Sequence, residues 1–493
     1  MRHPFDFPRA PMRPVPRAAW SAALILALAG CAAAPSARLT PDPGVAVPAA
    51  WSDATPAADT ASVALAHWWE RFDDPVLTDL VTRSLAASTN VRAAQARLRQ
   101  ARAQRDVTAA GLGPSVTASA SAQRSKTGGD SAVSQYRAGF DASWEPDIFG
   151  ATRSGVVAAD ADVESSAGSL ADTRVSVAAE VAVAYLQLRG LQARLAIARA
   201  NLASQEQTLE LTRWRAQAGL VTSLEVEQAR AAVEQTRAQL PVLETGIAQT
   251  LNSLAVLAGQ APGTAPAALS AAAPLPAAPE DLALVIPAET LRQRPDVRAA
   301  EAQVVAAAAR VDQATADRLP AFSLGGSLGL SALTVAGLSE GEAVVRSLLA
   351  GVSLPVFDNG GRRAQVRLRR AALDEAQENY RAVVLAALQD VEDALVALRK
   401  AREQLAAQRR AAEAARNAAL LADNRYASGL IDFQTVLETQ RTLLSAQDGV
   451  AGTEAELGAD YVRLYKALGG GWTPAAADED SERMPPAAAQ GST

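Results

Sequence analysis

Residues 90–103 read NVRAAQARLRQARA, and residues 296–309 read DVRAAEAQVVAAAA, so the same Val-Arg-Ala-Ala motif occurs twice, 206 residues apart. Both stretches are rich in alanine, which forms helices readily because it loses no side-chain entropy there. Self-similarity over so long a period indicates internal duplication. The two stretches therefore predict that one structural unit, beginning with a helix, occurs twice.

The match extends to two later places in the chain. SWEPDIFGATRS (143–154) lies opposite SLPVFDNGGRRA (353–364), and AGLVTSLEVEQAR (218–230) lies opposite SGLIDFQTVLETQ (428–440), both after a step of 210 residues. The spacing rises from 206 residues at the opening match to 210 at the next, so the second copy must contain four more residues than the first between these two places.

These matches divide the chain into parts. We predict a first repeat over 85–260 and a second over 288–472, joined by a Pro/Ala-rich linker over 261–287. Residues 31–84 form the N-terminal segment of the mature chain. The acidic, Pro/Ala-rich tail over 473–493 has nothing to bury and is predicted to be disordered.

The first thirty residues are typical of a secretory signal: four arginines, an apolar run over 18–29, and small residues before Cys31. The run is too short to span a membrane as a helix. Leu28-Ala29-Gly30-Cys31 resembles the processing box of bacterial lipoproteins, and Ala32 stands where an inner-membrane retention aspartate would sit. We therefore expect residues 1–30 to be removed and a covalent lipid on Cys31 to anchor the protein in the outer membrane of a Gram-negative cell. An ordinary signal with a chance cysteine is the alternative.

Composition narrows the function classes. Processing would leave 43 basic and 52 acidic residues, a formal charge of −9, which argues against a nucleic-acid partner. With Cys31 committed to lipid, one histidine, His67, remains, and no His/Cys metal cluster, cysteine nucleophile or disulfide can be assembled. His67 stands beside Trp68-Trp69 and is interpreted as a packing residue. No G-x-S-x-G, P-loop or dinucleotide fingerprint appears, although Ser-Lys or paired-carboxylate catalysis stays open. We expect no enzyme, no metal, and no cofactor besides the lipid.

Each repeat holds one stretch with the period of a β-strand. Over 134–145, one face carries Tyr136, Phe140 and Trp144 and the other carries polar side chains; over 322–330, apolar residues alternate with serine and glycine. These patterns predict β-hairpins over 113–147 and 320–357.

Two-faced strands of about ten residues suit a transmembrane β-barrel, although a soluble hairpin packed on a core would look similar. Four strands from one chain cannot close a barrel, and an open edge is not tolerated in lipid. Three chains would supply 12 strands, within the known range.

The rest of each repeat carries apolar residues every seventh position, which is typical of antiparallel coiled-coil hairpins. The positions run up to a glycine, Gly219 or Gly429, and resume after it. They are Val181, Leu188, Leu195, Leu202 and Leu209, then Val226, Val233, Leu240, Ile247 and Leu254; in the second repeat Val384, Val391, Leu398 and Leu405, then Val436, Leu443, Val450, Leu457 and Leu464.

Taken together and in order, the motifs resemble those of TolC-type outer-membrane efflux proteins, in the NodT/OprM-like lipoprotein branch. Resemblance covers nearly everything from 65 to 472. The residues that carry it are Leu28–Cys31, Trp68-Trp69 with Phe72–Pro75, Trp144-Glu145 with Asp147 and Phe149-Gly150, Arg294–Arg298, Leu354–Phe357 with Gly360–Arg363, Arg425-Tyr426 with Gly429-Leu430, and Leu464–Trp472.

The resemblance implies a mixed fold: a membrane β-barrel joined to an α-helical coiled-coil barrel in the periplasm, closed as a homotrimer with 12 strands. It implies a passive exit duct of a tripartite efflux pump that carries drugs or other small molecules. The partners would be a periplasmic adaptor and an inner-membrane transporter, usually of the resistance-nodulation-division class. Alternatives are the exit channel of a type I secretion or metal-efflux system, and a non-conducting structural envelope lipoprotein.

The same resemblance suggests where function resides. The hairpin tips, Gly219-Leu220 and Gly429-Leu430, would contact the adaptor. Beyond the tips, acidic residues would narrow the tunnel into a gate that favours cations and responds to protonation, unless they are ordinary solvated charges. The candidate gate residues are Glu438, Glu225, Asp432, Arg425 and Tyr426. The backbone would bend between strand and helix at a joint formed by Gly150, Arg153, Gly360, Gly361 and Arg363, with Arg362 beside them.

Overall fold

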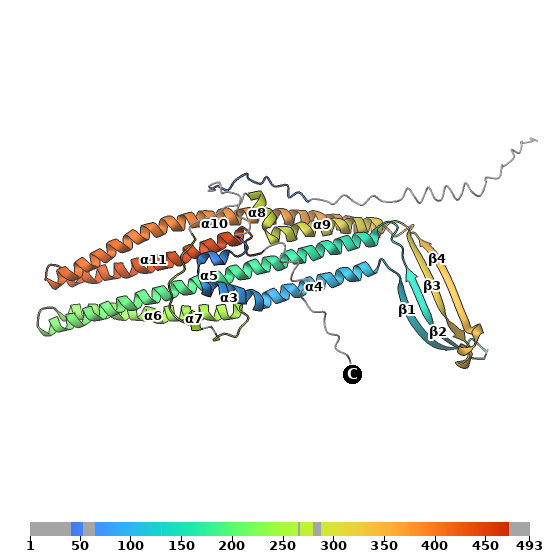
Figure 1. The fold of residues 1–493 in the computed structure, drawn as a ribbon, viewed down its shortest axis with the longest axis horizontal. Coiled ribbons are helices and arrows are strands. Elements are labelled where there is room, and N and C mark those ends of the chain that lie inside the picture. Colours follow the sequence, from blue (N-terminus) through green and yellow to red (C-terminus); the bar gives the residue numbers. More distant parts are fainter. Residues whose placement is uncertain (1–40, 53–64, 130, 265–266, 280–286, 473–493) are drawn as a thin grey trace, which may run out of the picture. The chain divides into compact units, whose positions relative to one another are not determined.

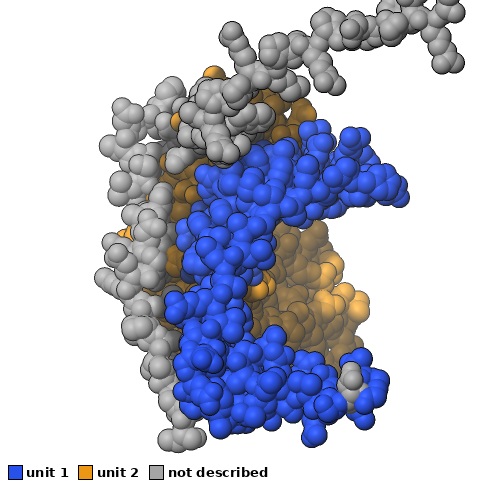
Figure 2. All heavy atoms as spheres, turned by 90° about the vertical axis from the view of Figure 1, so that its right-hand side faces the viewer, with its two compact units in different colours: residues 1–41, 103–160, 305–374 blue, residues 42–102, 161–304, 375–493 orange. Residues whose placement is uncertain are grey.

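The computed structural model describes residues 41–52, 65–129, 131–264, 267–279 and 287–472 (Figure 1). The expected signal peptide, Cys31 and the tail over 473–493 lie outside these described residues. The chain divides into two compact units. Unit 1 is 1–41, 103–160 and 305–374; unit 2 is 42–102, 161–304 and 375–493. Figure 2 colours the two units and shows that unit 1 is hollowed along one side.

Unit 1 contains a four-stranded antiparallel sheet in the order β1-β2-β3-β4. The strands are β1 (Ser115–Ser125), β2 (Val133–Trp144), β3 (Ala321–Ala332) and β4 (Val344–Ser353). Each repeat supplies one hairpin, as predicted, and β2 pairs with β3 to join them. Two short 3-10 helices, η2 (Ala336–Ser339) and η3 (Gly341–Ala343), lie in the second turn. Within this sheet, β1 and β4 each pair on one side alone.

The register separates the two faces of the sheet. Ala118, Phe140, Leu328 and Arg346 lie in one row across the four strands. Thr117, Asp141, Ser327 and Ser347 lie in the adjacent row, on the other face, where the Ser119 hydroxyl donates to Asp141 at 2.9 Å and the Ser327 and Ser347 hydroxyls lie 2.7 Å apart. One face is therefore apolar along most of its length, and the other is built largely of serine, threonine and glycine.

The sheet is also sheared. At the turn end, Ser125 pairs with Val133, but Ala332 pairs with Tyr136 and Leu330 pairs with Val344. From β1 to β4, the strand ends are therefore displaced along the strand direction by five residues in total, about 17 Å. The three strand spacings between them add up to about 14 Å. Strand ends of equal height would require a tilt of about 50°, close to the tilt of about 45° of strands in outer-membrane barrels.

The helices confirm the duplication. α4 (Thr89–Ala110) and α9 (Pro295–Ala316) have 22 residues each, α5 (Ala151–Gln217) and α10 (Gly361–Ala427) have 67, and α6 (Ser223–Leu257) and α11 (Phe433–Ala467) have 35. The first pair starts 206 residues apart and the other two start 210 apart. The four extra residues lie in the turn of the second hairpin, which has 11 residues between its strands where the first has 7.

Most of the seventh-position residues of both repeats are buried in unit 2 (Val181, Leu188, Leu195, Leu209, Val233, Leu254, Val384, Val391, Leu398, Leu405, Val436 and Leu464). Trp68, in η1 (Trp68–Phe72), stacks on Tyr465 with ring centres 5.5 Å apart. His67 contacts the edge of Trp69 at 5.5 Å between ring centres. Among the described residues, no helix combines the length and apolar character needed to cross a bilayer.

Part of the expected linker is held by a buried arginine of α5. Arg189 is 1 % exposed and donates to the backbone carbonyls of Ala271 and Ala268 at 2.7 and 3.2 Å, next to α7 (Ala267–Ser270). Tyr185, one turn earlier, donates to Asp74 at 2.6 Å, the residue that caps α3 (Pro75–Ala87). Another short helix, α8 (Pro287–Gln293), precedes α9. The charge-assisted hydrogen bonds of Arg189 therefore hold residues 267–271 against α5.

Candidate functional site

The tips of the two helical hairpins share one backbone design. Gly219 and Gly429 have φ of 71° and 72°, and no atom lies within 4 Å of the place where a Cβ would stand. Glycine adopts this left-handed conformation without steric cost. The next residues, Leu220 and Leu430, are 74 % and 73 % exposed. Each tip thus presents an exposed leucine directly after a left-handed glycine.

Near the tips, the two hairpins of one chain pack on each other. A buried cluster contains Leu209 of α5, Val233 of α6, Ala422 and Tyr426 of α10, and Phe433 of α11. Two polar contacts also join α11 to α5: Gln440 donates to the Thr208 hydroxyl at 3.3 Å, and, about 20 Å farther from the tips, Arg194 binds both oxygens of Asp448 at 2.6 and 2.9 Å. All four long helices therefore meet in this region of unit 2.

One arginine joins the two tips directly. The guanidinium carbon of Arg215, in the last turn of α5, lies 4.7 Å from the ring centre of Tyr426 in α10. The same guanidinium donates to the carbonyls of Tyr426 and Ala427, at the C-terminus of α10, over long distances of 3.5 Å each. The Tyr426 ring in turn packs on Phe433 at 5.4 Å. We call this contact of Arg215 with Tyr426 and the end of α10 the Arg215 clasp.

The clasp combines two weak attractions. A cation over a tyrosine face is attracted by the ring quadrupole, and a cation at a helix C-terminus interacts favourably with the helix dipole. Arg425 stands at the equivalent position of the second repeat and is exposed. Within the described residues, its side chain makes no hydrogen bond or ion pair to a neighbouring coil.

The candidate gate residues occupy different places at the tips. Asp432 caps α11, its carboxylate accepting hydrogen bonds from the Thr435 backbone N–H at 2.8 Å and hydroxyl at 2.6 Å. These bonds lower the pKa of Asp432 from its ordinary value. Glu225 lies in the first turn of α6, three residues after the N-cap residue Thr222, whose side chain makes no capping hydrogen bond. Glu438 is exposed on α11.

Of the five candidates, Tyr426 alone lies in the buried cluster, and the single chain does not bring Arg425 to Asp432. Among the described residues, no group of three or more His, Cys, Asp or Glu side chains is arranged to hold a metal ion.

In unit 1, the expected joint lies between strand and helix in both repeats. Gly150 and Gly360 have φ of 81° and 84° and stand directly before α5 and α10. After β2, the Asp147 carboxylate accepts from the Arg153 backbone N–H at 2.7 Å and from its Nε at 3.2 Å. An aspartate thus ties the bend to the first turn of α5.

The second joint uses a different aspartate. The Asp358 carboxylate accepts from the backbone N–H groups of Gly360 and Arg362, each at 2.9 Å, and these bonds lower its pKa. Gly361 begins α10, and Arg363 is exposed in its first turn. Both joints therefore rely on an aspartate that the sequence did not single out as a joint residue.

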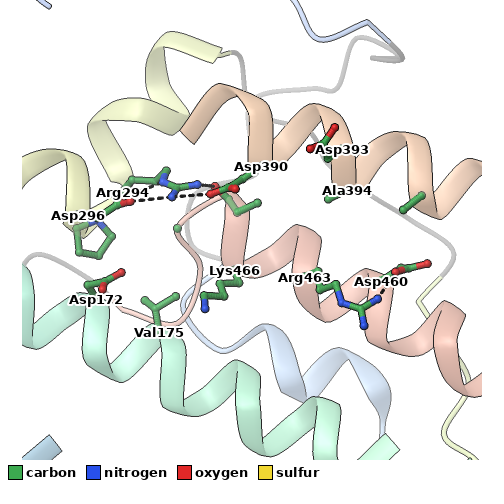
Figure 3. Close-up of a pocket in the computed structure, with 14 residues that line it drawn as sticks. Asp172, Val175, Arg294, Asp296, Asp390, Asp393, Ala394, Asp460, Arg463 and Lys466 are labelled. Carbon is green, nitrogen blue, oxygen red and sulfur yellow. Dashed lines mark hydrogen bonds and ion pairs between the residues drawn. The ribbon is translucent and has the colours of Figure 1, made fainter. Parts of the chain in front are cut away.

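Unit 2 also contains a charged cavity of about 430 Å³ (Figure 3). Arg294 binds Asp296 at 2.7 Å, Asp390 at 3.0 Å and the Ala467 carbonyl at 2.9 Å, and so links the start of α9 to α10 and α11. Burial, followed by the charge of Asp296, raises the pKa of Asp172. The cavity lining carries both signs of charge (Asp172, Asp296, Asp390, Asp393, Asp460, Arg294, Arg463 and Lys466).

Three arginines with structural consequences, Arg189, Arg215 and Arg294, were not identified as site residues from the sequence. Arg294 lies in a quoted motif together with Asp296, but its other partners, Asp390 and the Ala467 carbonyl, are 96 and 173 residues away. Arg215 stands four residues before a tip glycine, as Arg425 does. This repeated spacing could have identified the position, but it does not indicate which residue the arginine contacts.

Comparison with known proteins identifies the family. The model of the family described as outer membrane efflux protein matches residues 80–260 and 286–470. The pyoverdine export outer membrane protein OpmQ of Pseudomonas aeruginosa is 35% identical over 466 residues, covering 92% of this chain and 96% of its own. The toluene efflux pump outer membrane protein TtgF of Pseudomonas putida is 31% identical over 469 residues, covering 92% and 96%.

Solved structures agree with the sequence relatives. The outer-membrane channel OprN has a TM-score of 0.79 and 36% identity, covering 89% of this chain and 100% of its own. VceC of Vibrio cholerae has a TM-score of 0.77 and 26% identity, covering 83% and 99%. The predicted fold and outer-membrane location are confirmed, and the chain belongs to the outer membrane efflux protein family.

Proposed function

We propose that this efflux channel acts as a homotrimer whose three sheets close one 12-stranded barrel, with the helical hairpins forming a periplasmic tunnel. The observation that carries the proposal is the sheet itself. Its two faces differ in polarity, its two edge strands each pair on one side alone among the described residues, and its shear corresponds to a tilt of about 50°. Because a sheet in lipid must have no open edge, β4 of one chain pairs with β1 of the next.

The duct opens passively and catalyses no reaction. Its energy comes from an inner-membrane transporter of the resistance-nodulation-division class, and a periplasmic adaptor binds the exposed leucines at the tips, Leu220 and Leu430. Cys31 carries the lipid anchor. The names of the relatives, pyoverdine export and toluene efflux, support small-molecule cargo rather than secreted protein or metal ions.

The gate lies at the tips, where Glu438 and Glu225 recur three times around the trimer axis and repel one another. The Arg215 clasp holds the two hairpins of each chain together and so favours the closed tunnel. Charge removal at Glu438 removes this repulsion and the attraction for cations, and is therefore expected to lower both conductance and cation selectivity. If Glu438→Gln leaves both unchanged in single-channel recordings, Glu438 does not form the gate.

Adjacent residues on opposite sheet faces provide the direct test of the barrel. Leu328 lies on the apolar face and Ser327 on the polar face. An arginine facing lipid near mid-membrane costs about 2–4 kcal/mol, whereas one facing the lumen meets water. We expect Leu328→Arg to reduce the folded trimer in the outer membrane, and Ser327→Arg to leave the trimer intact but lower its cation conductance in planar bilayers.

Equal effects of the two substitutions on folding would contradict the barrel. A non-conducting tether between envelope layers, the remaining alternative, predicts no channel activity from the purified wild-type trimer.

A further inference from the structure

The apolar face of the sheet carries two arginines, both at the turn end. Arg124 is on β1, on the face of Ala118, Ala120 and Ala122, one residue before the strand ends. Arg346 is on β4, opposite Leu328, two residues after the strand begins. Both are exposed. The remaining residues of this face are apolar or small apart from Ser134 and Tyr136, also near the turn end.

A guanidinium on a lipid-facing surface is costly unless it reaches the headgroup region. At a tilt of about 50°, one and two residues from the strand end correspond to depths of about 2 and 4 Å. Both arginines therefore lie where a long side chain extends to lipid phosphates. The acidic residues of the second turn, Glu340 and Glu342, lie outside the strands, in the turn between β3 and β4.

The two arginines stand on the two edge strands. If β4 of one chain pairs with β1 of the next, Arg346 and the next chain's copy of Arg124 approach across one strand spacing of about 5 Å, at similar height. Two guanidinium groups over one headgroup can bind a phosphate from two sides, and guanidinium–phosphate bonds are among the strong charge-assisted hydrogen bonds. This arrangement rests on the proposed trimer and goes beyond its duct function.

We propose that Arg124 and Arg346 form, at each boundary between chains, a site for the phosphate headgroup of an anionic lipid in the outer leaflet. The acyl chains lie along the apolar face beside Phe140 and Leu328. Three such sites encircle the barrel just below its outer rim.

The test uses the full-length trimer in detergent, titrated with phosphatidic acid and followed by native mass spectrometry. The wild type is expected to bind three phosphatidic acid molecules in preference to phosphatidylcholine. A basic residue near an anionic headgroup contributes about 1 kcal/mol, or about fivefold in affinity, so the double variant R124Q/R346Q should bind about 25-fold more weakly. R124K/R346K, which keeps the charge, should stay within a few-fold of the wild type.

Arg137→Gln is the matched control, because Arg137 lies on the polar face, opposite Ser121 and Ser331. It should leave lipid affinity unchanged. Lipid binding by R124Q/R346Q equal to the wild type, an equal loss in Arg137→Gln, or displacement of the lipid by equimolar inorganic phosphate would each overturn the site. A species that remains monomeric in the same spectra would instead refute the proposed trimer.

Discussion

Removing the Arg215 clasp tests how the tips are held together. Arg215→Gln takes away the cation that lies 4.7 Å from the Tyr426 ring centre and contacts the last carbonyls of α10. A half-exposed cation–π pair contributes about 0.5–1 kcal/mol, and a cation at a helix C-terminus about 0.3–1 kcal/mol. The sum, about 1–2 kcal/mol per chain, corresponds to a shift of about 5- to 30-fold in the ratio of open to closed tips.

The assay is single-channel recording of the purified trimer in planar bilayers, with the open fraction as the measured quantity. We expect Arg215→Gln to raise it by at least about fivefold. Arg425→Gln is the matched control, since Arg425 holds the equivalent position without the tyrosine partner. Tyr426→Phe should behave as the wild type, because the buried Tyr426 hydroxyl has no hydrogen-bond partner among the described residues. An unchanged open fraction in Arg215→Gln, or an equal rise in Arg425→Gln, would refute the clasp.

Three further predictions concern stability. Arg189→Met removes the charge-assisted hydrogen bonds to the carbonyls of Ala268 and Ala271 and should lower the free energy of unfolding by about 1.5–3 kcal/mol, measured as a lower Tm, whereas the exposed Arg199→Met should cost less than about 1 kcal/mol. Gly139→Ala places a Cβ 2.6 Å from the Gly329 Cα and should destabilise the sheet by about 1–3 kcal/mol, seen as less heat-resistant barrel on gels. Asp172→Asn should stabilise the protein at neutral pH and not in acid, because burial raises the pKa of Asp172. The protonated carboxyl contributes its full stability below about pH 3.9, and this contribution is lost as the pH rises through the raised pKa. An equal gain at both pH values would contradict this.

Much of the architecture could be predicted because it repeats. The steps of 206 and 210 residues reappear as the spacing of the helix starts, and the alternation over 134–145 reappears as the two faces of β2. Such features depend on residues close in sequence, whose periodicity reports directly on which side of an element is buried. The tip glycines, Gly219 and Gly429, were predictable for the same reason, since a helix that reverses direction requires a left-handed residue.

The long-range polar contacts could not be predicted in this way. The long-range partners of Arg189, Arg294 and Arg215 lie 79 to 212 residues away, and an arginine in an alanine-rich helix gives no local sign of being buried. Only the packing of several helices brings their carbonyls and carboxylates to it. Asp432 shows the converse: its charge marked it as a gate candidate, and the structure adds that within the chain its carboxylate caps its own helix.

The two repeats differ most informatively at the tips. Arg215 and Arg425 occupy equivalent positions, but the residue after Arg215 is Ala216 and the residue after Arg425 is Tyr426. A clasp can therefore form in one direction only, from the first hairpin to the second, because only the second offers an aromatic face. Identical hairpins would give a trimer six equivalent contacts between neighbouring coils. With one such aromatic ring per chain, the trimer has three clasps. Contacts between hairpins within a chain and between chains can therefore differ in strength, and the weaker contacts would separate first when the tunnel opens.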